Sequence, residues 1–274
     1  MRRVALGDEI FWTVEALAAD LVALGVAPGD AVMVHASLRR VGPVLGGGDG
    51  VIAALRQAVG PLGCILAYVS WLEQFEDALG GDGHLDPALK PHIPAFDPAS
   101  ARANPDHGWF AEALRTTPGA RRSANPGASV VALGAGAEAF TADHPLDYGY
   151  GAGSPFARLA AAGGKIVMLG APLDTMSLLH HAEHLADVPG KHIRRMEVPL
   201  ATPGGVTWRL IEEYDTVDPV VDGLDEDYFA TIVEDFLASG QGARGRVGDA
   251  PSVLVPADAM TRFGVDWLEA RFRA

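Results

Sequence analysis

Short apolar runs, often β-branched, alternate with stretches of helical periodicity along most of the chain, and this alternation constrains the fold more than any other feature. The segment TVEALAADLVALGV at residues 13–26 has apolar residues at helical spacing and reaches its end near Gly25, and the apolar run DAVMVHASL at 30–38 follows it. The pattern repeats with a predicted helix at 50–60 and a predicted strand at 64–71. Such alternation is typical of an α/β protein.

The second half of the chain continues the alternation and adds a hairpin. Strands are predicted in VVALG and KIVMLG, with helices in the segments 154–164 and 175–187. The runs at 192–201 and 206–215 are predicted to be two strands joined by a turn at Pro203, Gly204 and Gly205. We therefore expect an α/β fold with a mostly parallel central sheet covered by helices and an antiparallel addition.

Length and composition indicate one globular unit. The chain has 274 residues, of which 49% are hydrophobic and 20% charged, which is enough for a sizeable core. No repeat, low-complexity tract or Pro/Ser-rich linker marks a boundary, so a single domain over 1–274 is predicted. Residues 73–105, rich in Gly, Pro, Asp and His, are expected to form a long loop of the kind that usually carries function.

The charge and the cysteine content limit the partners and the compartment. A formal net charge of −14 argues against nucleic acid and anionic membranes and favours a cationic ligand. The only cysteine, Cys64, cannot form an internal disulfide, which fits a reducing compartment. No signal peptide and no run of about 20 apolar residues is found, so a cytoplasmic location and no membrane partner are expected.

The segment LLHHAEH, residues 178–184, concentrates three of the nine histidines. It fits H-x-x-E-H, the signature of a class of zinc peptidases, and His180 and His184 are four residues apart, as two ligands on one helix face must be. A catalytic zinc needs a third protein ligand, which a later acidic residue would supply. A zinc-dependent hydrolase using this helix is therefore one hypothesis.

The other hypothesis for the same segment is general-base catalysis by one neutral imidazole that a carboxylate orients. His180 follows the strand KIVMLG by about one helical turn, and the later run RLIEEYD offers Glu212, Glu213 and Asp215. Strand alternation puts Glu212 and Glu213 on opposite faces, so one of them could meet His180. From these residues alone, both hypotheses stay open.

Ligands of open α/β sheets bind beyond the carboxyl ends of the strands. This rule places His35, the pair Ser70 and Trp71, and the loop after Gly170 on one rim. No G-x-S-x-G motif surrounds Ser70, so a serine hydrolase is not indicated, although such serines can donate hydrogen bonds to a developing oxyanion.

Several ordered blocks together resemble the aminoglycoside 3-N-acetyltransferases, most closely the subgroup that modifies gentamicin-type antibiotics. The blocks span nearly the whole chain after the first few residues. They are VHASLRRVGPVLGG, LAYVSW, RRSANP, GSPFARL, LGAPLDTMSLLHHAEHLADVPGK, IEEYDTVDP, EDYFATIVEDFLASGQGARGRVGDAPSVLV and FGVDWLEARF. The resemblance implies acetyl-coenzyme A-dependent acetylation of the 3-amine of the 2-deoxystreptamine ring, antibiotic resistance, no metal, and an α/β fold distinct from that of the common GNAT acetyltransferases.

The resemblance also implies roles for individual residues. His180 is the expected general base, Glu212 the carboxylate that orients it, with Glu213 as the rival, and Asp215 a substrate contact. The expected cofactor-binding residues are His35, Ser37, Arg39 and Ser123, and Ser37 or a backbone N–H would stabilise the thioester oxyanion. The expected substrate-binding residues are Tyr68, Trp71, Glu73, Glu76, Asp77, Glu183, Glu213 and Asp215.

Overall fold

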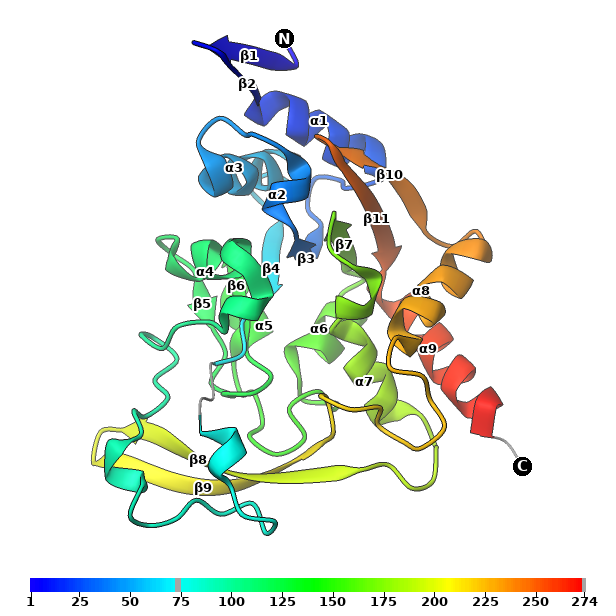
Figure 1. The fold of residues 1–274 in the computed structure, drawn as a ribbon. Helices are drawn as coiled ribbons and strands as arrows, with labels where there is room; N and C mark the ends of the chain where they lie inside the picture. The colour runs from blue at the N-terminus through cyan, green and yellow to red at the C-terminus, as the bar shows by residue number, and fades with distance from the viewer. Residues whose placement is uncertain (72–74, 273–274) are drawn as a thin grey trace.

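The computed structural model describes residues 1–71 and 75–272 and is built around a seven-stranded mixed sheet (Figure 1). The strand order is β10-β11-β7-β3-β4-β6-β5. The strands are β3 (Ala31–Ala36), β4 (Cys64–Tyr68), β5 (Arg121–Arg122), β6 (Val130–Gly134), β7 (Lys165–Leu169), β10 (Ala243–Val247) and β11 (Ala250–Pro256).

The α/β class is confirmed, but the parallel part of the sheet is smaller than expected. Only β3 pairs in parallel, with β4 on one side and β7 on the other, and the remaining pairings are antiparallel. An apolar run indicates that a strand is buried, but it does not indicate whether the strand is parallel or antiparallel to its neighbours. That direction depends on the connections between the strands.

Helices cover both faces of the sheet, and the alternation of side chains along each strand separates the two cores. In β3, Val32 and Val34 pack into one apolar cluster and Met33 into the other; in β4, Ile65 joins the first cluster and Leu66 the second. The first cluster includes residues of α1 (Val14–Leu24), α3 (Gly47–Val59) and α4 (Gly108–Thr116). The second includes residues of α5 (Ala137–Thr141), α6 (Pro155–Ala161), α7 (Leu178–Leu185), α8 (Tyr228–Ala238) and α9 (Ala257–Phe272).

Two hairpins lie apart from the main sheet (Figure 1). The predicted one is confirmed: β8 (Ile193–Thr202) pairs in antiparallel register with β9 (Gly205–Tyr214). The other was not predicted, and it joins β1 (Arg3–Leu6) to β2 (Glu9–Trp12) at the N-terminal end of the chain.

The long loop packs on the β8–β9 hairpin, and its described residues are 75–105. Phe75, Leu85 and Phe96 form a small apolar cluster with Trp71. The backbone N–H of Phe96 donates to the carbonyl of Pro199 in β8 at 2.8 Å. Short 3-10 helices at Glu76–Ala78, Lys90–His92 and Pro105–His107 are the regular elements of this segment. The loop is thus a structured cover over the hairpin.

The parallel strands bring functional segments to one edge of the sheet. Because β3 is parallel to both neighbours, the carboxyl ends of β3, β4 and β7 point the same way. The turn from β3 into α2 (Leu38–Val41), the residues after β4 and the loop after β7 meet there, as expected. Within the described residues, no helix is both long and apolar enough to cross a membrane.

Candidate active site

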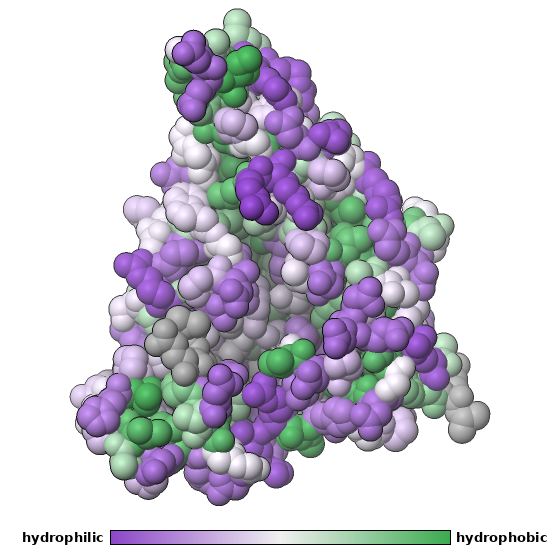
Figure 2. Space-filling view, viewed as in Figure 1, coloured by the Kyte–Doolittle hydropathy of each residue, from purple (hydrophilic) through white to green (hydrophobic). Residues whose placement is uncertain are grey.

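Two cavities lie beyond the carboxyl ends of the parallel strands and share one wall. The large cavity has a volume of about 730 Å³ and the small cavity about 380 Å³. Tyr68, Asp106, His107 and His180 line both of them, and we call these four residues the junction. Figure 2 shows the same face hollowed between the α4 side and the α7 side, above the β8–β9 hairpin.

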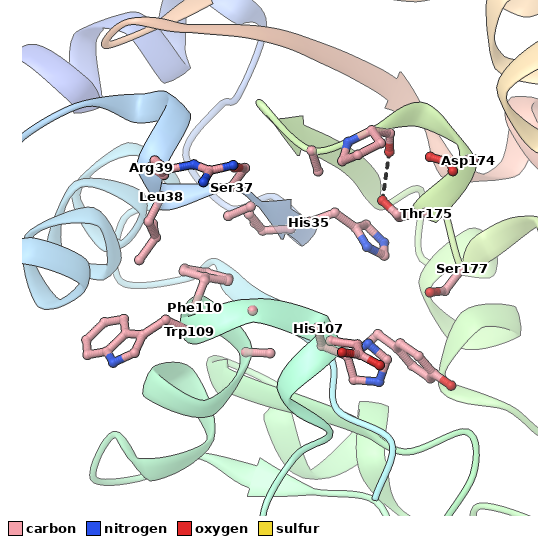
Figure 3. A pocket seen from close by; sticks show the side chains of 18 of the residues that line it. His35, Ser37, Leu38, Arg39, His107, Trp109, Phe110, Asp174, Thr175 and Ser177 are labelled. Carbon is pink, nitrogen blue, oxygen red and sulfur yellow. Dashed lines mark hydrogen bonds between the residues drawn. The ribbon is translucent and has the colours of Figure 1, made fainter. Parts of the chain in front are cut away.

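The large cavity runs between the β3–α2 turn and the beginning of α4. Figure 3 shows His35, Ser37 and Arg39 on the first wall and His107 and Trp109 on the opposite one. The segment that leads into α7 closes a third side with Asp174, Thr175 and Ser177. The walls therefore combine hydroxyl groups, a guanidinium and aromatic rings.

The small cavity lies between the junction, the long loop and the β8–β9 hairpin. Its acidic residues are Glu76, Asp106 and Glu213, and its only cationic side chain among the described residues is Arg194, which lies 3.6 Å from Glu76. Trp71 and Tyr150 contribute aromatic surface to it. Carboxylates beside aromatic faces suit a polyamine with sugar rings.

His180 is held in one orientation by a carboxylate of its own helix. Its Nδ1 lies 2.7 Å from Oε2 of Glu183, three residues on, where helix geometry brings the two side chains together. Glu183 is only 1% exposed and accepts a second hydrogen bond from the hydroxyl of Tyr228 in α8. The ring of His180 lies between those of Tyr150 and Phe229, with centroids at 4.9 Å and 4.8 Å.

This arrangement leaves one nitrogen of His180 available. Because Nδ1–H donates to the Glu183 carboxylate, the neutral ring carries its lone pair on Nε2. Nε2 has no hydrogen-bond partner among the described residues, and His180 lines both cavities. The residue thus presents a base where the cavities meet.

The three neighbouring histidines do not converge on one point. His184 Nε2 pairs with Glu213 Oε1 at 2.6 Å, and His181 Nδ1 donates to the carbonyl of Tyr150 at 2.7 Å. Across residues 1–71 and 75–272, no group of three or more His, Cys, Asp and Glu side chains could hold a metal ion. The zinc hypothesis therefore has no ligand set in the described part of the chain.

Two more histidines face the large cavity in the neutral state. Burial, together with a smaller contribution from the nearby His107, lowers the pKa of His35 to about 4. Burial also lowers the pKa of His107 to about 4, although Asp106 opposes the shift. His35 Nε2 is buried without a hydrogen-bond partner in the described structure, and His107 Nε2 lies 2.5 Å from the hydroxyl of Ser70.

Comparison with known proteins identifies the family. Residues 33–269 match the family described as aminoglycoside 3-N-acetyltransferase. The chain belongs to this family. The family predicted from the sequence blocks is confirmed, and with it the enzyme class, an acyltransferase.

Individual members of the family resemble this acetyltransferase over nearly its whole length. Aminoglycoside N(3)-acetyltransferase III of Pseudomonas aeruginosa is 47% identical over 253 residues, 91% of each chain. Aminoglycoside N(3)-acetyltransferase VIII of Streptomyces fradiae is 44% identical over 264 residues, 93% of this chain and 91% of the relative.

Solved structures of family members share the fold. AAC-IIIb in a binary complex with CoASH superposes with a TM-score of 0.95 at 64% identity, covering 96% of this chain and 98% of that one. AAC-VIa bound to sisomicin gives a TM-score of 0.91 at 40% identity, covering 96% and 100%. The expected fold of the aminoglycoside 3-N-acetyltransferases is thereby confirmed.

Glu212 does not orient His180 in this acetyltransferase. Its carboxylate accepts from Arg195 Nε at 2.7 Å and from the Tyr148 hydroxyl at 3.2 Å, and its side chain is 37% exposed. Glu213, the rival, pairs with His184 instead. The orienting carboxylate belongs to Glu183, because an i,i+3 partner on the same helix is nearer than any residue of the hairpin.

Two further expectations are corrected for the same kind of reason: the side chain is satisfied inside the protein. Glu183 was expected to contact substrate, but it is buried and its oxygens bind His180 and Tyr228. Ser123 was expected to bind cofactor, but it is fully buried, accepts from the N–H of Val130 at 2.9 Å and pairs with His144 at 2.8 Å.

The remaining predicted residues divide according to the cavities. His35, Ser37 and Arg39 line the large cavity, and Tyr68, Trp71, Glu76 and Glu213 line the small one. Asp77 is exposed and lines no cavity described here. Asp215 lies outside both cavities and accepts the N–H groups of Val217 and Asp218 in a turn. Glu73 lies outside the described residues.

Two junction residues, Asp106 and His107, were not predicted from the sequence. They lie at the end of the long loop, where no periodic pattern indicates which side chains face a ligand. The only local signal is Asn104 before Pro105, which predicts a turn or helix start, and Asn104 does accept the N–H of Asp106 at 3.0 Å.

Proposed function

We propose that this chain transfers the acetyl group of acetyl-coenzyme A to the 3-amine of the 2-deoxystreptamine ring of aminoglycosides, with His180 as general base and Glu183 as the residue that orients it. The observation that carries the mechanism is the position of His180 on the wall common to both cavities, with Nε2 unpaired among the described residues. The family and the solved complexes of its members with CoASH and sisomicin support the substrates.

The large cavity is the proposed site of the thioester end of coenzyme A. In a protein of net charge −14, phosphates need local donors and cations. Ser37 and Arg39 on the β3–α2 wall supply a hydroxyl and a guanidinium, and His35 beside them supplies an unsatisfied imidazole nitrogen. The aromatic surface of Trp109, which is 59% exposed, lies on the opposite wall.

The small cavity is the proposed site of the antibiotic. Glu76, Asp106 and Glu213 would attract a polycation, and Trp71 and Tyr68 would pack against sugar faces. Gentamicin-type drugs, including tobramycin and sisomicin, are the proposed substrates, with resistance as the consequence for the cell. The proposed location is the cytoplasm, which the free, buried thiol of Cys64 supports.

The mechanism resolves a conflict between binding and reaction. Carboxylates favour the ammonium form of the antibiotic amine, which aids binding but has no lone pair for attack. His180 Nε2 takes one proton from the ammonium, and the freed amine attacks the thioester carbon. The nitrogen loses its second proton to solvent as the carbon–sulfur bond breaks to release coenzyme A thiolate. The thiolate recovers a proton from the imidazolium. General-base help of this kind is worth about 10²–10⁴ in rate.

The direct test is release of free thiol from acetyl-coenzyme A with gentamicin, sisomicin or tobramycin as acceptor, followed by NMR assignment of the acetylated nitrogen. We expect thiol release and a 3-N-acetyl product. No thiol with any of these amines, or acetylation at another nitrogen, would overturn the proposal.

A matched pair of variants tests the base. His180→Ala should lose activity, whereas His192→Ala, at a histidine whose side chain is 42% exposed, should retain it. Prolonged dialysis against a chelator tests the alternative of a zinc-dependent enzyme. We expect unchanged turnover after dialysis. Loss of activity that added Zn²⁺ restores would favour the zinc alternative.

A further inference from the structure

We infer that His107, held by Ser70, is a second catalytic residue of this enzyme: a neutral hydrogen-bond donor to the thioester carbonyl oxygen, which becomes an oxyanion as the amine attacks. The inference rests on the proposed function of the two cavities and extends it. It starts from the position of His107, one of four residues that line both cavities. An amine in one cavity and a thioester in the other would meet at the wall that these residues form.

Ser70 fixes the tautomer of His107. The Ser70 hydroxyl has one hydrogen-bond partner among the described residues, His107 Nε2, at 2.5 Å. Ser70 is 8% exposed, so its proton would be left without an acceptor if the imidazole were the donor in this pair. Donation from Ser70 satisfies both groups and puts the ring proton on Nδ1.

The proton on Nδ1 has no competing acceptor among the described residues. Nδ1 of His107 makes no hydrogen bond within the described structure, and it is not among the buried unpaired atoms, of which His35 Nε2 is the one found. The ring packs on that of Tyr68, with centroids 4.5 Å apart and an angle of 58° between the planes. Figure 3 shows His107 projecting from the α4 side into the large cavity.

The surroundings keep His107 neutral, which suits a donor and not a base. Its pKa falls to about 4 because burial disfavours the imidazolium and Arg122 repels it, and Asp106 offsets this only in part. His35, which also faces the large cavity, is neutral as well. His180, by contrast, has Nδ1 held by the buried carboxylate of Glu183 and the lone pair of Nε2 available. The two junction histidines thus have different roles. His180 accepts a proton from the amine, and His107 stabilises the negative charge on the thioester oxygen.

The step is balanced without another reactant. As the nitrogen–carbon bond forms, the carbonyl π electrons move to oxygen, and the Nδ1–H of His107 donates to that oxygen without transferring its proton. When the carbonyl reforms, the carbon–sulfur bond breaks and the thiolate leaves. Removal of a single donor to an oxyanion lowers kcat by roughly 10²–10³.

Three variants test the inference by a split between kcat and KM. His107→Ala should lower kcat by roughly 10²–10³ and leave KM for both substrates within about threefold. His107→Asn, whose amide nitrogen reaches nearly the same point as Nδ1, should recover about tenfold of the loss. Ser70→Ala should give a smaller fall in kcat, because it frees the tautomer without removing the ring. His92→Ala, in an unrelated short helix of the loop, is the matched control.

Two readouts separate this role from a structural one. The pH profile of kcat should have the same shape in His107→Asn as in the wild type, because the proposed base, His180, is retained. The carbonyl stretching frequency of bound S-acetonyl-coenzyme A, an unreactive ketone analogue, should be lowered in the wild type and return toward its solution value in His107→Ala.

Three results would overturn the inference. The first is a His107→Ala variant with the kcat of the wild type, and the second is the same carbonyl stretching frequency in His107→Ala as in the wild type. The third is an acetyl adduct on Ser70 in mass spectra, because it would make Ser70 a nucleophile and His107 its base. Failure of the proposed function is distinct, because then the wild type itself would release no thiol with any aminoglycoside.

Discussion

Replacement of Glu183 by glutamine tests the central geometry of the site with the smallest change in shape. In the wild type, one oxygen accepts from His180 Nδ1 and the other from the Tyr228 hydroxyl. A glutamine in the same rotamer would keep its carbonyl oxygen on Tyr228 and turn its NH₂ group toward His180. The imidazole would then accept at Nδ1 and carry its proton on Nε2, where the base is needed.

The expected magnitude follows from this reversal. Where a serine protease loses the carboxylate that sets the histidine tautomer, kcat falls about 10⁴-fold, or about 5 kcal/mol of activation free energy. Glu183 is as buried as such a carboxylate and makes the same contact, so we expect a loss of about 10³–10⁴ in kcat. KM for both substrates should change little, because Glu183 lines neither cavity.

The assay is thiol release under saturating acetyl-coenzyme A and gentamicin, with thermal unfolding to confirm that each variant is folded. Glu212→Gln is the matched control, since its carboxylate binds Arg195 at the surface and should matter less than threefold for kcat. Retention of more than a tenth of wild-type kcat by Glu183→Gln would refute the tautomer argument. Equal losses in the two variants would restore Glu212 to the role expected from the sequence.

Three other predictions concern the interior and the cofactor wall. Ser123→Ala should lower the free energy of unfolding by about 1–3 kcal/mol, measured in urea, without changing KM for acetyl-coenzyme A, because its hydroxyl serves buried partners. Burial lowers the pKa of His35, His107 and His144 from 6.5 to about 4, so protonation favours the unfolded chain. For each of these histidines, the free energy of unfolding should fall by about 1.4 kcal/mol per pH unit as the pH drops from about 6.5 to 4. A urea midpoint that stays constant over that range would contradict this prediction. Arg39→Met should raise KM for acetyl-coenzyme A several-fold and make it less sensitive to salt, with kcat unchanged; an unaltered KM would remove Arg39 from the cofactor site.

The sequence by itself determined the features that depend on near neighbours. Alternating strand and helix patterns predicted the α/β class and the β8–β9 hairpin, because periodicity reflects which side of an element is buried. The crowding of histidines after a buried strand pointed to His180, which does lie at the cavities. The spacing of His180 and Glu183 also indicated that the two side chains are in contact, since residues three apart on a helix are adjacent. The prediction nevertheless chose the carboxylates of the later strand, Glu212 or Glu213, as partners of His180.

Tertiary structure alone decided which partners each of these groups has. Glu183 is buried against His180 and lines neither cavity because α8, 45 residues further on, covers it with Tyr228. His107 reaches the junction because the long loop folds back on the hairpin and returns to Ser70, 37 residues earlier. A local pattern reports burial and helix or strand, whereas these contacts depend on how distant segments pack, and that packing also set the antiparallel direction of the outer strands.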